Sequence, residues 1–147
     1  MNKDYRVLLD SYCRKAIASI ELVEASLKEL DKYSVTRNYT PKELEPYDAL
    51  SDRFIRAVET CIKFFKTYEY YLYAVSSDSY RELLLHMEKK NLISAAETWI
   101  DMRNRIVHDY LPQQIKNIYD LIMSEFRNEL FILRIKIKEI NINISTE

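Results

Sequence analysis

The sequence contains no glycine among its 147 residues, and only three prolines. Antiparallel sheet proteins usually need glycine in their tight hairpin turns, where the backbone must adopt a positive φ. The absence of glycine therefore favours an all-α protein whose helices are joined by loops without left-handed residues. It also excludes glycine-rich phosphate-binding loops, and with them the P-loop and Rossmann classes of nucleotide site.

Cysteine, histidine and net charge are also scarce. Cys13 and Cys61 lie in partly apolar helical stretches without the spacing of metal ligands, so we expect reduced thiols and no metal site. His86 has no second histidine, cysteine or carboxylate pair nearby, which favours a structural role. The formal net charge is −1, whereas proteins that bind long nucleic acids are usually basic. Any contact with RNA is therefore expected to be local.

Long apolar runs are missing as well. The stretch 70–75 is among the longest, and it is far too short to span a bilayer. The first six residues lack the apolar core of a secretory signal. Hydrophobic residues make up 48% and charged residues 31% of the chain, which is typical of a globular protein. We expect one cytoplasmic domain over residues 1–147 that does not engage a membrane.

Apolar residues recur at helical spacing in five segments of the chain. The predicted helices run from Lys3 to Lys32, from between Pro46 and Ser51 to Ala74, from Tyr80 to Lys90, from Ser94 towards Pro112, and from Gln113 to Ile140. Ser79 is among the residues expected to cap the third helix, and Ser94 with Glu97 has the form of a capping box for the fourth. This order predicts an all-α, up-and-down bundle of four to five helices.

Arg103 projects from the middle of an apolar stripe on the fourth predicted helix. On a helical wheel, Trp99 and Ile106 fall within about 60° of it. A guanidinium cannot be neutralised in such a place, and its burial without a partner is costly. Arg103 therefore needs a carboxylate such as that of Glu59, a partner chain, or an anionic ligand such as phosphate.

Three further polar residues follow Arg103 at the end of the same helix, namely Asn104, His108 and Tyr110. Histidine exchanges a proton near neutral pH, and arginine can hold two phosphate oxygens as charge builds on them. The set therefore suits phosphodiester chemistry. The alternative is structural: Arg103 pairs with a core carboxylate, His108 lies at the surface and Tyr110 closes the core.

The segment Met102–Tyr110 resembles the R-N-x-x-x-H-x-Y signature of HEPN proteins (higher eukaryotes and prokaryotes nucleotide-binding). It looks most like two related branches, the HepT toxins and the substrate-binding subunits of nucleotidyltransferases. The run Asn91–Trp99 resembles the lead-in to the motif in the second branch, and Lys63–Lys66 resembles part of its second helix. Asn91 replaces the usual glycine of that branch, and Leu111 replaces a phenylalanine frequent in HepT proteins, so the choice between branches stays open.

The resemblance implies a HEPN-like bundle that forms a homodimer and acts as a metal-independent, cofactor-free endoribonuclease on RNA. In that family the motifs of two protomers meet across the dimer axis. His108 would then be the general base or acid for attack by the RNA 2′-hydroxyl. Arg103 would stabilise the transition state, and Asn104 would orient or bind the phosphate.

Tyr110 matches the tyrosine that a minimal nucleotidyltransferase, the cognate antitoxin, AMPylates in the HepT branch to silence the toxin. A bulky anionic adduct beside Arg103 would block the cleft. Two other functions stay open. The same cluster could hold a nucleotide or other substrate in a non-catalytic subunit of a nucleotidyltransferase, or it could pin the dimer of a helical adaptor.

Overall fold

The computed structural model describes residues 3–108 and 112–146, with the side chains of residues 3–4, 105–108, 112–115, 118 and 124–125 outside the description. Within these ranges the regular structure is entirely helical, which confirms the predicted all-α class. The elements are α1 (Lys3–Glu29), α2 (Pro41–Tyr73), α3 (Tyr80–Lys89), α4 (Ala96–His108), α5 (Pro112–Leu121), the π-helical turn η1 (Ile122–Phe126) and α6 (Arg127–Thr146). None of these described helices combines the length with the hydropathy that a transmembrane segment requires.

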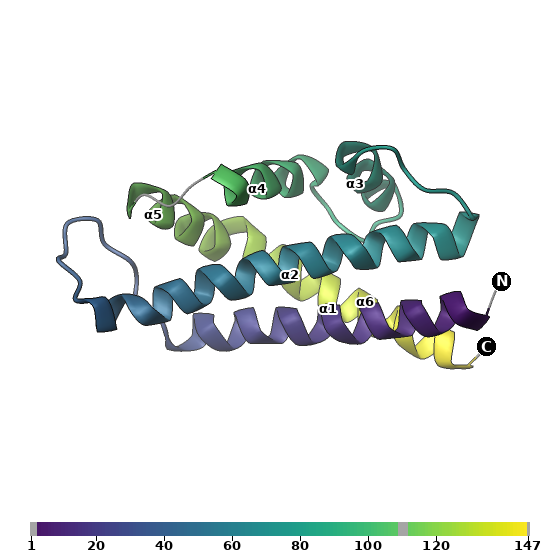
Figure 1. Ribbon diagram of the computed structural model, residues 1–147, viewed down its shortest axis with the longest axis horizontal. Coiled ribbons are helices and arrows are strands. Elements are labelled where there is room, and N and C mark those ends of the chain that lie inside the picture. The colour runs from purple at the N-terminus through teal and green to yellow at the C-terminus, as the bar shows by residue number, and fades with distance from the viewer. Residues whose placement is uncertain (1–2, 109–111, 147) are drawn as a thin grey trace.

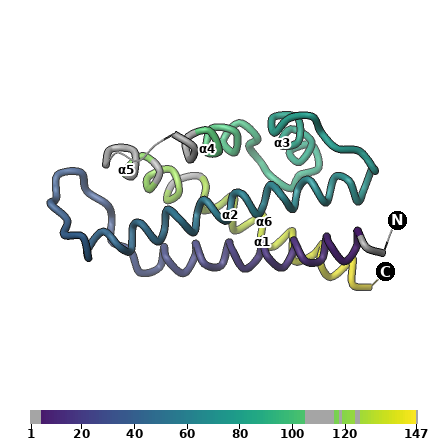
Figure 2. Tube along the Cα trace, in the orientation of Figure 1, coloured from purple at the N-terminus to yellow at the C-terminus, as the bar shows by residue number. Residues whose placement is uncertain are grey.

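The long helices α1, α2 and α6 pack together as a bundle (Figure 1). α1 and α2 form a hairpin whose loop lies at one end of the molecule, whereas both termini lie at the other end (Figure 1). α6 crosses α1, while α3, α4 and α5 lie along the opposite side of α2 (Figure 2). α2 is therefore covered on both sides, which explains why its buried residues face two directions.

Four buried aromatic rings fix α4 against α2 and η1. The ring of Trp99 lies 5.4 Å from that of Phe65 on α2 and 4.8 Å from that of Phe126 on η1. Phe126 also contacts Phe54, with 5.1 Å between ring centroids. All four side chains are fully buried. Such pairs contribute beyond the area that they bury, so this cluster sets where the residues just after Trp99 emerge from the core.

α2 begins earlier than predicted, at Pro41 instead of between Pro46 and Ser51. The hydroxyl of Thr40 accepts a hydrogen bond from the backbone N–H of Glu43, and the Glu43 carboxylate accepts one from the N–H of Thr40. This is a complete capping box, and proline at the next position has no N–H that the helix would need. Pro46 lies inside the helix, where it costs one intrahelical hydrogen bond.

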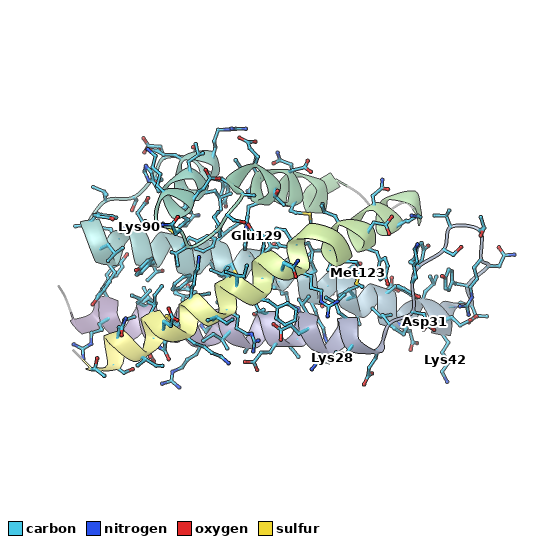
Figure 3. All side chains as sticks on the ribbon, turned by 180° about the vertical axis from the view of Figure 1, so that it is seen from behind. Lys28, Asp31, Lys42, Lys90, Met123 and Glu129 are labelled. Atoms are coloured by element: carbon cyan, nitrogen blue, oxygen red, sulfur yellow. The ribbon has the colours of Figure 1, made fainter. Side chains whose placement is uncertain are left out.

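The start of α4 is capped differently from the prediction. Glu97 does not close a box with Ser94 but pairs with Arg81 at the surface. The buried carboxylate of Glu129, which projects from α6 toward α4 (Figure 3), instead accepts from the N–H and hydroxyl of Ser94 and from the N–H of Ala95, at 2.6–3.1 Å. An acidic group here satisfies free N–H donors and complements the positive end of the helix. α3 has the expected cap, with Ser79 accepting from Glu82.

Two loops do contain left-handed residues, contrary to the expectation drawn from the absence of glycine. Ala74 follows α2 with φ 55°, and Asn91 follows the end of α3 with φ 60°. Helices commonly end on such a residue because it lets the last carbonyls find donors. Asparagine tolerates this conformation well, whereas alanine incurs about 1 kcal/mol of strain there. The chain meets the geometric need of its helix ends without glycine.

The last predicted helix, Gln113 to Ile140, is interrupted and longer than expected. The π-helical turn η1 separates α5 from α6, and α6 continues to Thr146. Such a turn inserts one residue into the helical ladder and shifts every later side chain around the axis. Before the turn Tyr119 is buried where α5 meets α2, and after it Leu133 is buried where α6 meets α1.

Candidate functional site

Arg103 lies on α4 four residues after Trp99, where the helix emerges from the aromatic cluster. Its side chain is half-buried, as the helical wheel predicted for a residue on the apolar stripe. The guanidinium carbon lies 3.5 Å from the centroid of the Tyr80 ring, at the start of α3. A cation over an aromatic face at this distance gains about 0.5–2 kcal/mol, depending on how far it is desolvated. Tyr80 therefore holds Arg103 in place.

Among the described residues, Arg103 has no carboxylate partner. Of the residues that the structure describes, none brings a carboxylate within ion-pair distance of its guanidinium. Glu59, the partner considered from the sequence, lies on the exposed side of α2 near Arg103 without pairing with it. The ring of Tyr80 carries no net charge, so it does not neutralise the positive charge of Arg103.

A hollow of about 220 Å³ opens beside Arg103, between α2, α4 and the start of α3. We call it the cationic hollow. Its lining comprises Val58, Glu59, Ile62, Lys63, Lys66, Tyr80 and Arg103. Three of these side chains are cations and one is a carboxylate. Lys63 and Lys66 are exposed and one turn apart on α2, so both can reach a group bound there.

Two neighbouring cations, Arg103 and Lys66, affect the pKa of the Tyr80 hydroxyl. A hydrogen bond from Arg103 and the positive charge of Lys66 lower the pKa of Tyr80 below its usual value. The ammonium of Lys66 lies 4.7 Å from the centroid of the same ring. Tyr80 is thus the contact between the lysine side of the hollow, on α2, and the arginine side, on α4.

The structure places the other predicted site residues only in part. Asn104 is exposed on α4, next to Arg103 in sequence and about 100° away from it around the helix. His108 is the last residue of α4, but its side chain lies outside the described residues. Tyr110 lies outside the described residues altogether. The predicted grouping of Arg103 and Asn104 with the imidazole and the phenol therefore stays a prediction.

A second hollow, of about 320 Å³, adjoins the cationic hollow because Lys66 and Tyr80 line both. We call it the serine hollow. The loop between α2 and α3 supplies half of its lining, which comprises Lys66, Glu69, Ser76, Ser77, Asp78, Ser79, Tyr80 and Leu83. Hydroxyl and carboxylate groups dominate it, so its chemical character differs from that of its neighbour.

One wall of the serine hollow is held by a closed hydrogen-bonded group. Glu69, which is 2% exposed, accepts from the N–H and the hydroxyl of Ser77, both at 2.6 Å, and pairs with Nδ1 of His86 at 2.7 Å. Burial would raise the pKa of Glu69, but the hydrogen bonds from Ser77 and His86 outweigh it and lower that pKa. His86 therefore has the structural role expected from the sequence, and it fastens the α2–α3 loop.

Most of the cationic hollow could not be predicted from the sequence. The sequence predicts Tyr80 only as the first residue of a helix, and it singles out the lysines only through the resemblance in Lys63–Lys66. No local pattern connects Tyr80 with Arg103, because the contact arises from the packing of α3 against α4. The spacing of Lys63 and Lys66 is the one signal that was available. Within the described residues, no group of three histidine, cysteine or acidic side chains could hold a metal ion.

Comparison with known proteins adds no family to this description. No family model, no curated protein and no solved structure matches the chain. The motif in 102–110 and the geometry around Arg103 are thus the two observations from which a function can be argued.

Proposed function

We propose that the chain is a HepT-like toxin, a metal-independent endoribonuclease that acts as a homodimer. One observation carries the proposal: Arg103 is a half-buried cation that no described carboxylate neutralises, and it opens onto a hollow with two more cations. The R-N-x-x-x-H-x-Y spacing of Arg103, Asn104, His108 and Tyr110 then suggests which phosphate chemistry the cation serves.

In the proposed reaction His108 takes the proton from an RNA 2′-hydroxyl, and the resulting oxygen attacks the adjacent phosphorus. The bond from phosphorus to the 5′-oxygen breaks, and that oxygen is protonated by the imidazolium of the second protomer. The products are a 2′,3′-cyclic phosphate and a 5′-hydroxyl. Arg103 stabilises the charge that builds on the phosphate oxygens, and Asn104 donates to the same group.

In this proposal the ribonuclease is inhibited by a second anionic group that competes for Arg103. A minimal nucleotidyltransferase would transfer AMP from ATP to the hydroxyl of Tyr110, which attacks the α-phosphorus while pyrophosphate leaves. The adduct brings a negative charge to within reach of Arg103, where it competes with the RNA phosphate. The toxin would stay silent for as long as the adduct remains.

The test is cleavage of single-stranded RNA by the purified full-length protein in excess chelator. The chain has two histidines, so His108→Ala has a matched control in His86→Ala, which lies outside the motif. We expect His108→Ala to lose at least a hundredfold in rate, and His86→Ala, which only loosens the α2–α3 loop, to lose less than tenfold when assayed well below its unfolding temperature. Cyclic phosphate ends would show cleavage by 2′-hydroxyl attack, and loss of cleavage in His108→Ala purified in the same way would exclude a contaminating ribonuclease. Equal rates for wild type and His108→Ala would remove the enzymatic claim.

A second candidate function is a non-catalytic subunit that presents a nucleotide or other substrate to a nucleotidyltransferase. The two adjoining hollows favour it, since their volumes of about 220 and 320 Å³ suit a small ligand. Titration with ATP and AMP, together with the cleavage assay, distinguishes the ribonuclease from the non-catalytic subunit. Binding that depends on Arg103, without any cleavage, would favour this subunit, whereas loss of the dimer in Arg103→Ala without a nucleotide effect would favour an adaptor.

A further inference from the structure

The cationic hollow has the electrostatic character of a phosphate site. Lys63, Lys66 and Arg103 line it against the single carboxylate of Glu59. Arg103 cannot lose its proton, and its guanidinium has five N–H donors, more than its hydrogen bond to Tyr80 uses. Two flexible ammonium groups and one planar guanidinium, supplied by different helices, are a common way of holding a phosphate group.

The serine hollow has the opposite character. Two carboxylates line it, Asp78 and Glu69, and Lys66 is its only cation in the described lining. Glu69 is already engaged by Ser77 and His86, whereas Asp78 is exposed at the mouth of the hollow. A phosphate would be repelled here. Hydroxyl and amino groups, which donate hydrogen bonds to carboxylate and serine oxygens, would be accepted.

Lys66 and Tyr80 form the boundary that both hollows share. A ligand that fills both must therefore carry an anionic group at one end and hydrogen-bond donors at the other, joined over a short distance. The serine hollow is also the larger of the two, with about 320 Å³ against about 220 Å³. The smaller end of the ligand is thus the charged one.

We propose that the two hollows together bind a single nucleotide, with its phosphate in the cationic hollow and its nucleoside in the serine hollow. The choice of a nucleotide, among phosphate esters of hydroxyl-rich groups, rests on the proposed function. Lys63 and Lys66 bind the phosphate beside Arg103, and Asp78 accepts hydrogen bonds from the sugar or base. The nucleotide is either free or one unit of an RNA strand.

The experiment measures binding to the full-length His108→Ala protein, which cannot cut RNA under the proposed function. The probes are inorganic phosphate, ribose 5-phosphate, AMP and a short single-stranded RNA. Lys66→Ala is compared with Lys42→Ala, which removes the same charge from α2 about 36 Å away along the helix. Figure 3 shows Lys42 at the opposite end of the molecule from Lys90, the residue that follows α3.

We expect Lys66→Ala to weaken AMP and RNA binding about fivefold to tenfold, and Lys42→Ala less than twofold. For RNA, the slope of log affinity against log salt should fall in magnitude by about 0.7 in Lys66→Ala, because one phosphate contact is lost. Tighter binding of AMP than of RNA would identify a free nucleotide, and the reverse order would identify a unit of a strand. Equal effects of the two lysine variants would overturn the proposal.

The variant Asp78→Asn tests whether the nucleoside of the ligand lies in the serine hollow. It is expected to change the affinities for inorganic phosphate and for AMP differently. Removal of its charge should leave inorganic phosphate binding unchanged or up to threefold tighter, because a repelling carboxylate has gone. AMP binding should weaken at least threefold, because an ionised acceptor has become a neutral one. A common change for both ligands, or phosphate binding as tight as AMP binding, would contradict a nucleoside in the serine hollow.

The failure of this proposal can be told apart from that of the proposed function. RNA cleavage that depends on His108 but is unaffected by Lys66→Ala and Asp78→Asn would leave the ribonuclease standing and remove the nucleotide site. AMP binding that depends on Lys66 and Asp78, in a wild-type protein without cleavage, would do the reverse. The absence of binding by all four probes at low salt would overturn the nucleotide site by itself.

Discussion

Glu129, which contacts the start of α4, and Arg103, which lies on α4, are both charged, but they differ in burial and in the partners of their charge. Glu129 is buried, and three hydrogen-bond donors from residues 94–95 surround its carboxylate. Arg103 is half-buried, and an aromatic ring instead of a carboxylate lies against it. The first charge is satisfied within the fold, whereas no described carboxylate satisfies the second. Under the proposed function, the difference separates a residue that maintains the architecture from a residue that binds phosphate.

Glu69 belongs with Glu129 in this comparison. It too is buried, and it takes its partners from the loop that leads to α3, through Ser77, and from α3 itself, through His86. Each carboxylate comes from a long helix of the bundle and fastens the beginning of a short one. The fold therefore uses its buried acids to dock α3 and α4, and these are the helices that bring Tyr80 and Arg103 together.

The largest loss of stability is expected for Glu129→Ala. It leaves the N–H groups of Ser94 and Ala95 without their acceptor at a buried helix start, and we expect a loss of about 3 kcal/mol in the free energy of unfolding. Urea denaturation monitored by circular dichroism measures it. The matched control is Glu97→Ala, which removes only a surface ion pair with Arg81 and should cost less than about 0.5 kcal/mol. Equal losses would mean that the helix is capped from within its own sequence after all.

Glu69→Gln is expected to cost about 2 kcal/mol at neutral pH, because hydrogen bonds to an ionised acceptor are lost. The sign of the pH dependence follows from the lowered pKa of Glu69. Its stabilisation is complete above the ordinary value of 4.5 and is lost as the pH falls through the lower value of the folded state. The stability difference between wild type and variant should therefore shrink below pH 4.5. The exposed Glu45→Gln should show no such trend, and a constant difference for Glu69→Gln would contradict the assignment.

The smallest effect on stability is expected for Arg103→Ala. This result would distinguish Arg103 most clearly from Glu129. The variant loses a cation–π contact but breaks no described ion pair, so we expect a cost of about 1 kcal/mol in the free energy of unfolding. Binding of single-stranded RNA, measured by fluorescence anisotropy, should weaken at least tenfold. A loss of 3 kcal/mol or more with unchanged RNA binding would place Arg103 among the architectural charges.

The fold could be predicted where its causes are local. The spacing of apolar residues located α1 and α3 closely, because a helix that packs on a core must repeat its apolar side every three to four residues. Thr40 and Glu43 also have the form of a capping box, so the true start of α2 could have been found from the sequence. The pair of Ser94 with Glu97 has the same form and misleads, since a carboxylate from a distant helix takes its place.

The candidate site could be predicted only around Arg103. Its position on an apolar stripe showed that it would be half-buried and in need of an anion, which depends on α4 alone. The contact with Tyr80 depends on how two short helices dock, and that docking depends on Glu69 and Glu129, which lie 34 and 26 residues from Arg103 in the chain. Contacts between residues so far apart in the chain cannot be predicted from the spacing of residues within one helix.

The π-helical turn Ile122–Phe126 has a consequence for how this chain can tolerate insertions and deletions. Because one extra residue is accommodated there, α5 faces α2 while α6 faces α1. Removal of a single residue from the turn would let it close to a regular α-helix and leave α6 facing α1, whereas one further inserted residue would rotate the whole of α6 by about 100° and advance it by about 1.5 Å. Leu130, Leu133 and Ile137 would leave the interface with α1 together in the second case. The chain is therefore expected to tolerate a deletion in this turn better than an insertion.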